Sequence, residues 1–312
     1  MRRGRRTWTF YTVTFHTVVA VGLLGCGRAE APPVSGESHA QAVEQWRRER
    51  HEDLLKPDGW LSLVGLSWLE EGDNTCGSDP ESDVPLPESA PARLAVLRMA
   101  ADGTVELEAA SGALLTVDGE SRRRATLRTD AEGDPTLVEH GSIQLHLIDR
   151  DGRIGVRVKD RRSPALAAFE GIESFAVDAG WRIEGRFVSY DPPKSIAVPT
   201  VLGTVSEQAS PGAVEMRVDG RAHRLDVLPG GDGEYFIVFG DATNGKETYG
   251  GGRFLYAAEA DAEGRVVLDF NRAYNPPCAF TPYATCPLPP PQNRLETAVR
   301  AGEKKYAGGV DH

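Results

Sequence analysis

A group of polar residues near the end of the chain could bind a polar or anionic ligand. On an extended strand, Asp269 and Asn271 point to one face and Arg272 points to the other. Carboxamides, a carboxylate, guanidinium groups and a phenol beside a rigid loop can recognise such a ligand. The seven candidate ligand-binding residues are Arg253, Asp269, Asn271, Arg272, Tyr274, Asn275 and Asn293. The alternative, that these side chains satisfy backbone groups beside the prolines, stays open at this point.

The loop that must position most of these residues runs from residue 269 to residue 294 and holds seven of the 21 prolines. Because proline fixes φ and lacks an amide hydrogen, this segment is neither a helix nor a central strand. It also carries Phe270, Phe280, Tyr283 and Leu288, apolar anchors that a solvated linker would not need. The sequence therefore predicts an ordered loop that wraps the surface of a folded body.

Two cysteines of this loop, Cys278 and Cys286, are candidates for a disulfide. They lie eight residues apart in a segment that turns sharply, and an oxidising compartment favours pairing. Buried free thiols and a metal or redox pair are the alternatives, although zinc sites usually show closer cysteines with further ligands. Cys76 is expected to be a small, buried, apolar side chain.

Other common catalytic and metal-binding signatures are missing from the sequence. The segment from Gly65 to Leu69 lacks the second glycine of a nucleophile elbow, and no H-E-x-x-H motif occurs. His140 and His146 have no partners at metal-binding spacing. The glycine-rich run over residues 243–253 is not followed by a helix, which favours a hairpin over a phosphate-binding loop. We therefore expect no cofactor and no metal, and the sequence leaves open whether the protein is an enzyme.

The first 25 residues have the layout of a secretory signal. Four arginines precede a mostly apolar run that ends Leu23-Leu24-Gly25-Cys26. This ending resembles the bacterial lipobox, whose cysteine is lipidated and becomes the mature N-terminus. We predict a signal peptide over residues 1–25, lipidation of Cys26 and a tether over residues 26–40. The alternative is an uncleaved anchor helix, but the apolar run is interrupted and short for a membrane crossing.

The predicted location is the cell envelope, on the extracytoplasmic side. Gly27 rather than an aspartate follows Cys26, which favours the outer membrane if the source has one. The signal holds four of the 35 basic residues and no acid, so 31 basic and 46 acidic residues remain, a net charge of −15. This balance argues against nucleic-acid binding and against electrostatic attachment to anionic lipid. Membrane contact should therefore come from the lipid on Cys26.

Aspartate–glycine pairs at short spacing predict β-hairpins. The four pairs are Asp102-Gly103, Asp118-Gly119, Asp151-Gly152 and Asp219-Gly220. Apolar residues alternate around them, as in Ile143, Leu145 and Leu147, which is typical of antiparallel strands buried on one face. Residues 41–54 have helical periodicity and are followed by Pro57, which ends a helix.

The predicted fold is mainly β, an antiparallel sandwich or barrel-like body with one N-terminal helix. We expect a single domain over residues 41–307. A secondary boundary could fall near residues 160–175, where the strand pattern breaks before it resumes.

Longer motifs carry a family resemblance. Residues 235–245 read YFIVFGDATNG, residues 248–255 read TYGGGRFL and residues 269–280 read DFNRAYNPPCAF. Together with residues 59–66, GWLSLVGL, they resemble the bacterial and archaeal family of unknown function numbered 1684. The resemblance covers the chain from about Trp46 to Tyr306. No activity is established for that family, so it implies no catalytic residue, and it favours the Cys278–Cys286 pair over a required role for Cys76.

Three functions are consistent with the sequence. We prefer a lipid-anchored extracytoplasmic β protein that binds a small polar or anionic ligand or an envelope partner. The first alternative is an enzyme of undefined class with a site around Arg253, Asp269, Asn271 and Tyr274. The second is a purely structural envelope module. A cleft in which these side chains converge would favour the enzyme, whereas their use as backbone caps would argue against it.

Overall fold

The computed structural model describes residues 36–309. The predicted signal peptide, Cys26 and most of the predicted tether lie outside these residues. From Gly36 onwards the chain forms one compact unit. As predicted, the fold is mainly β, with three sheets and one long N-terminal helix. No helix in the described part of the chain is long and apolar enough to cross a membrane.

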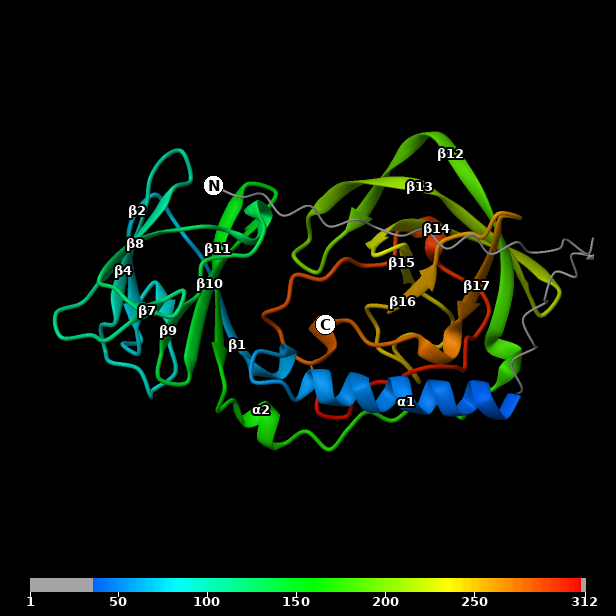
Figure 1. Ribbon diagram of the computed structural model, residues 1–312, viewed down its shortest axis with the longest axis horizontal. Coiled ribbons are helices and arrows are strands. Elements are labelled where there is room, and N and C mark those ends of the chain that lie inside the picture. The colour runs from blue at the N-terminus through cyan, green and yellow to red at the C-terminus, as the bar shows by residue number, and fades with distance from the viewer. Residues whose placement is uncertain (1–35, 310–312) are drawn as a thin grey trace, which may run out of the picture. The chain divides into compact units, whose positions relative to one another are not determined.

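Helix α1 (Gly36–Leu54) packs along the nearly closed barrel described below (Figure 1). It ends at Leu54, where the sequence predicted, but begins at Gly36 rather than at residue 41. Val43 and Leu54 are buried on its inner face. On the same face the Arg50 guanidinium lies 4.6 Å from the centre of the Tyr274 ring. The helix is thus fixed by both an apolar and a cation–π contact.

Two sheets enclose the first hydrophobic core. The six-stranded sheet has the order β1-β11-β10-β9-β6-β7, and the five-stranded sheet has the order β3-β2-β4-β5-β8. The strands of the first sheet are β1 (Leu63–Trp68), β6 (Thr116–Val117), β7 (Glu120–Ser121), β9 (Val138–His140), β10 (Ile143–Arg150) and β11 (Arg153–Asp160). Those of the second are β2 (Gly72–Gly77), β3 (Val84–Pro85), β4 (Ala95–Met99), β5 (Val105–Ala109) and β8 (Arg124–Leu127).

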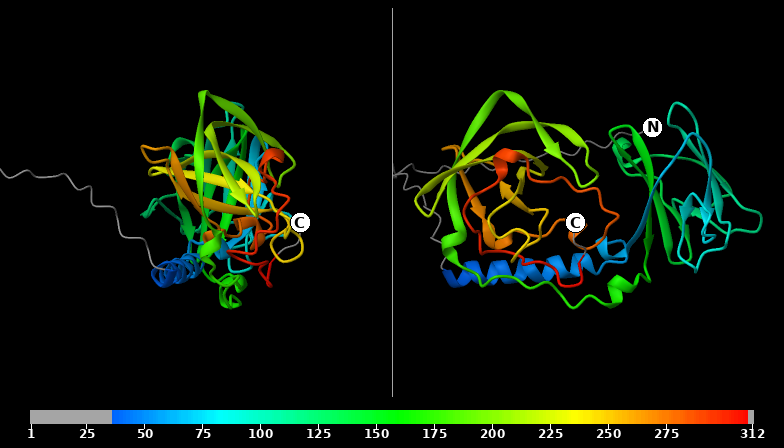
Figure 2. Two further views of the ribbon diagram at one scale, coloured as in Figure 1. Left: turned by 90° about the vertical axis from the view of Figure 1, so that its right-hand side faces the viewer. Right: turned by 180° about the vertical axis from the view of Figure 1, so that it is seen from behind.

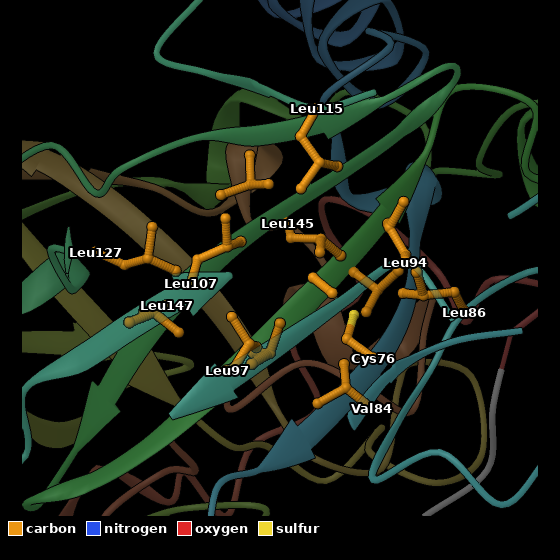
Figure 3. Close-up of a cluster of buried hydrophobic side chains, with 14 of the residues drawn as sticks. Cys76, Val84, Leu86, Leu94, Leu97, Leu107, Leu115, Leu127, Leu145 and Leu147 are labelled. Carbon is orange, nitrogen blue, oxygen red and sulfur yellow. The ribbon is translucent and has the colours of Figure 1, made fainter. Parts of the chain in front are cut away.

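The core between these sheets is made of aliphatic side chains from both (Figure 3). Leu97 and Leu107 from one sheet pack with Leu145 and Leu147 from the other. Cys76 is 1% exposed within this cluster, and burial raises the pKa of its thiol to about 12. It is therefore a small apolar core residue, as the sequence indicated.

The remaining six strands form a nearly closed barrel. Their order is β16-β15-β14-β13-β12-β17, and the two end strands, β16 and β17, approach each other. The strands are β12 (Arg182–Pro199), β13 (Val205–Val218), β14 (Arg221–Gly231), β15 (Glu234–Phe239), β16 (Arg253–Ala258) and β17 (Arg265–Asp269). Alternate residues such as Val214, Leu225, Ile237, Leu255 and Leu268 fill its interior.

Short helices occupy the connections. They are η1 (Trp60–Ser62), η2 (Asp130–Glu132), α2 (Pro164–Ala167), η3 (Ala179–Trp181), η4 (Phe270–Arg272), η5 (Pro277–Ala279) and η6 (Pro291–Asn293). The turn that precedes α2, residues 160–163, is held by hydrogen bonds from its own side chains. The Asp160 carboxylate accepts from the amide of Arg162, and the Ser163 hydroxyl accepts from the amide of Ala165. This segment links the β11 strand to the barrel.

The predicted aspartate–glycine turns all connect neighbouring antiparallel strands. Asp118, Asp151 and Asp219 have φ of 49°, 56° and 49°, and the glycine after each also has a positive φ. Two consecutive positive φ values are the pattern of a type I′ turn, which suits a two-residue hairpin. In the fourth pair only Gly103 has a positive φ, of 85°.

Strands β12 and β13 continue beyond the sheet as a two-stranded arm, residues 194–210 (Figure 2). Their register shifts between Ser189 and Lys194, and the pairing of β13 with β14 begins only at Gly212. The tip of the arm is bonded to the proline-rich loop. The Val201 amide donates to the Cys286 carbonyl at 3.0 Å, and the Leu288 amide donates to the carbonyl of Pro199, at the end of β12, at 2.7 Å.

Candidate functional site

Arg253, the first of the predicted binding residues, is fully buried and bonds to the protein itself. Its guanidinium lies 2.8 Å from a carboxylate oxygen of Asp241, and both side chains are 0% exposed. It also donates to the carbonyls of Val299 at 2.8 Å, Ala301 and Glu303. Burial lowers the pKa of Arg253, and the Asp241 carboxylate opposes that shift. Arg253 therefore fastens the C-terminal segment to the barrel.

The three predicted asparagines are buried and bond to the backbone. Asn271 accepts from the Asp178 amide at 3.0 Å and donates to the Asp178 carbonyl at 2.9 Å. Asn293 does the same with the amide and carbonyl of Asp226, at 2.7 and 2.8 Å. Asn275 donates to a carbonyl of the C-terminal segment at 2.7 Å. Each asparagine side chain thus makes hydrogen bonds to backbone groups that would otherwise need a neighbouring strand as partner.

The other three predicted residues also contact the protein. Asp269 accepts from His39 of α1 at 2.7 Å, and Arg272 is 3.8 Å from the same carboxylate. The Tyr274 ring stacks on Tyr256 with 6.3 Å between centroids. Burial, and then Tyr256, raise the pKa of Tyr274.

The structure brings Asp269, Asn271 and Arg272 together at the end of β17, but the seven residues do not converge on one cleft. All seven lie in the described range, and none lines the cleft described below. The placement favours the role of satisfying the backbone and argues against an enzyme built on these residues.

Cys278 and Cys286 lie side by side as free, buried thiols. The Cys278 amide donates to the Cys286 sulfur at 3.1 Å. The hydrogen bond between the two thiols, and then burial, raise the pKa of Cys286, while the same bond lowers the pKa of Cys278. The disulfide stays a prediction, which an intact mass lower by about 2 Da before reduction would establish. Within residues 36–309 no group of His, Cys, Asp and Glu could hold a metal ion.

A cleft of about 550 Å³ lies where the arm, the proline-rich loop and the β10–β11 turn meet. Its volume falls in the range of small-molecule sites. Its apolar lining consists of Val198, Leu202, Leu228, Pro229, Phe236 and Pro287. Its polar lining consists of Thr200, Thr204, Ser206 and Gln208 from the arm, Asp149, Arg150 and Asp151 from the turn, and Thr285 from the loop.

A larger hollow of about 870 Å³ lies on the outer face of β12, β13, β14 and β17. Arginines and glutamates alternate over it, and Arg224 and Glu215 form an exposed ion pair at 2.8 Å. Such pairs on an open strand surface are typical of a solvated face. We therefore take the smaller cleft, whose lining combines apolar and polar side chains, as the candidate binding site.

Arg150 and Thr285 line the loop side of this cleft, and Thr285 also bonds to Arg157, which does not line the cleft itself. The Thr285 hydroxyl accepts from Arg150 Nε at 3.1 Å and from a terminal nitrogen of Arg157 at 2.9 Å. Arg150 also forms a two-point pair with Asp130, at 2.9 and 2.7 Å. Burial alone would raise the pKa of Asp130, but hydrogen bonds from Arg150 and the Asp149 amide hold it below its usual value.

Arg157 has no carboxylate partner of this kind among the described residues. It is 8% exposed, and its Nε has no hydrogen-bond partner among the described residues. Its guanidinium lies 5.3 Å from the centre of the Trp60 ring. Burial, and then the positive charge of Arg150, lower the pKa of Arg157 to about 10.

His146 lies opposite Arg157 in the β10–β11 register. It is 8% exposed, and its Nδ1 has no partner within the described chain. Burial, and then Lys159 and Arg157, lower the pKa of His146 to about 4. The imidazole is therefore neutral at neutral pH.

The residues at this end of the cleft were not predicted from the sequence. In β11, Val156 and Val158 face the core, so Arg157 and Lys159 must face the other way. The alternation can be read from the sequence, but it does not reveal that the charged residues are buried, because a charged outer face of a strand is normally solvated. The missing information was that the proline-rich loop covers this face. The only available signal was the set of apolar anchors in the loop, which require a surface to pack against.

Comparison with known proteins finds a family match within the second half of the chain. The matching region runs from α2 through the barrel and the proline-rich loop to the C-terminal segment. Residues 167–304 match the family DUF1684, described as a protein of unknown function. The resemblance predicted from Trp46 is therefore supported for this range alone. The DUF1684 region supplies the arm and Thr285, while Arg150 and Arg157 come from outside it. No curated protein matches the chain.

Two solved structures show limited similarity. The solution structure of an uncharacterized protein of Haloarcula marismortui is 29% identical, with a TM-score of 0.38, over 44% of this chain and 78% of that one. A crystal structure of Rad53 in complex with AMP-PNP is 10% identical, with a TM-score of 0.16, over 65% of this chain and 48% of that one. At such TM-scores neither structure supports a conclusion about fold or function.

Proposed function

We propose that this is a lipid-anchored, extracytoplasmic protein of the cell envelope that binds a small ligand in the cleft beneath the arm. The ligand has an apolar body and a polar or anionic end. The observation that carries the proposal is the cleft, which is about 550 Å³ in volume and is lined by both apolar and polar groups. Small-molecule sites combine a mostly apolar lining with a few fixed polar groups.

The polar groups of the arm are held in place before any ligand binds. Thr200 and Thr204 share a hydrogen bond of 2.8 Å across the arm tip. Gln208 donates to Ser206 at 2.8 Å on the same strand. Because the arm tip is also bonded to the proline-rich loop, the walls are largely preformed, which reduces the entropy lost on binding.

A bulky substitution on the inner face of the arm should block the cleft. Ser206 lines it, whereas the neighbouring Val205 is 58% exposed and points the other way along β13. A suitable probe is 1-anilinonaphthalene-8-sulfonate, which joins an apolar fluorophore to an anionic group. We expect saturable fluorescence with the wild-type protein and an affinity lower by at least about tenfold for Ser206→Trp.

Val205→Trp is the matched control and should bind the probe as the wild type does. It adds the same indole to the same strand without entering the cleft. Equal affinity of the probe for both variants would mean that it binds elsewhere and would contradict the proposed site.

The anchor is proposed from the motif that ends in Cys26. A net charge of −15 in the mature chain gives no electrostatic attraction to anionic lipid. We therefore expect Cys26→Ser to move the protein from the membrane fraction to the soluble fraction when it is expressed in a host with lipoprotein processing. A variant that stayed with the membrane would show that another part of the chain attaches it.

A further inference from the structure

We propose that the loop side of the cleft is an oxyanion subsite, in which Arg150 and Thr285 from the lining bind a carboxylate or phosphate group of the ligand, and the buried Arg157, which bonds to Thr285, supplies a second positive charge. This inference rests on the proposed function, because it names the chemistry of one end of a ligand in the same cleft. Both groups present planar or tetrahedral oxygens that a pair of guanidinium groups binds well.

Two cations converge here on one neutral oxygen. Arg150 and Arg157 both donate to the Thr285 hydroxyl, at 3.1 and 2.9 Å. Asp130 neutralises Arg150 by a two-point pair, but no described carboxylate pairs with Arg157. A hydroxyl oxygen satisfies the geometry of the donors but carries no charge, so the two arginines share the single carboxylate of Asp130. An anion at this place would supply a second negative charge.

Buried groups at this end of the cleft also have unmet hydrogen-bonding capacity. Arg157 is 8% exposed, yet its Nε has no partner in the described structure. A buried polar group without a partner is costly, and a buried charge more so. Within residues 36–309 the Nε atoms of Arg47, Arg253 and Arg272 also lack a partner, but each of those arginines has a carboxylate partner, which Arg157 lacks. The lowered pKa of Arg157 has the same origin, since burial and Arg150 both disfavour its charge. An oxyanion bound beside Thr285 would offset the charge effect.

Nearby carboxylates limit the size of the anionic group. Asp149 and Asp151 also line the cleft, at the turn between β10 and β11. The Asp149 carboxylate accepts from the Gly152 amide at 2.8 Å, and Asp151 is exposed. Negative charge at this wall repels a polyanion. The arrangement therefore suits a single carboxylate or phosphate on an otherwise apolar molecule.

The test compares three probes with the same ten-carbon chain, decanoate, decyl phosphate and decan-1-ol, on the full mature protein. Calorimetry gives affinities, and the change in total tryptophan emission includes Trp60, whose ring lies 5.3 Å from the Arg157 guanidinium. We expect at least one anionic probe to bind about tenfold or more tightly than the alcohol, as charge-assisted hydrogen bonds require. The order of the two anions then decides between carboxylate and phosphate.

Arg157→Gln is the decisive variant. It should remove the preference for anions and leave the affinity for decan-1-ol unchanged. The matched control is Arg124→Gln, which removes an equal charge from an exposed arginine on β8 that pairs with Glu108 and should keep the preference. Without ligand, Arg157→Gln should have an unchanged or higher melting temperature, because it removes an uncompensated buried charge.

The outcomes separate this inference from the function on which it rests. Equal affinity of all three probes for the wild type would overturn the oxyanion subsite and leave the cleft as a binding site. A preference that survived in Arg157→Gln, or a clearly lower melting temperature of that variant, would also overturn the subsite. Failure of decan-1-ol, both anions and the fluorescent sulfonate to bind would reject the proposed function itself.

Discussion

Arg253→Met is expected to lower the free energy of unfolding by about 3–5 kcal/mol, as breaking a buried ion pair does. The substitution leaves the Asp241 carboxylate buried without its cation, and both side chains are 0% exposed in the native protein. It also removes the donors that reach the carbonyls of Val299, Ala301 and Glu303. Urea unfolding of the mature chain, followed by tryptophan fluorescence, measures the change.

Two further variants define the cause of that loss. Arg272→Met is the control, because this arginine is 41% exposed and lies 3.8 Å from its carboxylate partner, which is too far for a hydrogen bond. It should change the free energy of unfolding by less than about 0.5 kcal/mol. Arg253→Met combined with Asp241→Asn should recover part of the stability lost by the single substitution. A loss below about 1 kcal/mol for Arg253→Met would contradict the role assigned to this pair.

Acid should destabilise the protein through His146. In the unfolded chain this histidine takes up a proton near the ordinary histidine pKa of 6.5, whereas in the folded protein burial and neighbouring cations lower its pKa to about 4. The unfolded state therefore binds the proton first as the pH falls, and stability decreases between these values. The expected contribution is roughly 3 kcal/mol by pH 4. Chemical unfolding at a series of pH values measures it.

His146→Gln should flatten the stability profile between pH 6.5 and pH 4, because it removes the group that titrates. His140→Gln is a matched control, since His140 lies on the neighbouring strand β9 and is bonded through Nδ1 to the Leu114 carbonyl at 2.9 Å. That variant should keep the acid sensitivity of the wild type. Identical profiles for His146→Gln and the wild type would show that other groups control the acid response.

Local patterns in the sequence predicted much of the fold. The Asp118, Asp151 and Asp219 turns depend on a positive φ that Asp-Gly pairs adopt readily. The helix that ends at Leu54 was predicted from its periodicity and from the proline that follows. The arm was not predicted, because the alternation along β12 and β13 is the same whether a strand pairs within a sheet or projects from it. The two cases differ only in whether further strands pair alongside, which depends on the tertiary structure.

The candidate site was harder to predict than the fold. Arg253, Asn271 and Asn293 have side chains that suit ligand binding, but composition does not show whether their partners are a ligand or the backbone. The structure commits them to buried carbonyls and amides. Arg150 and Arg157 were missed because a charged residue on the outer face of a strand is normally solvated. Both bond to Thr285 of the proline-rich loop, and Arg157 is buried there, more than 100 residues away in the sequence.

The most direct test of a ligand-binding cleft is native mass spectrometry of the protein purified from its own cells, with Ser206→Trp prepared in parallel. We predict a co-purifying small molecule on the wild-type protein and on Val205→Trp, and its loss from Ser206→Trp. A bare mass for the wild type, or a bound mass that Ser206→Trp retains, would contradict the assignment of this cleft.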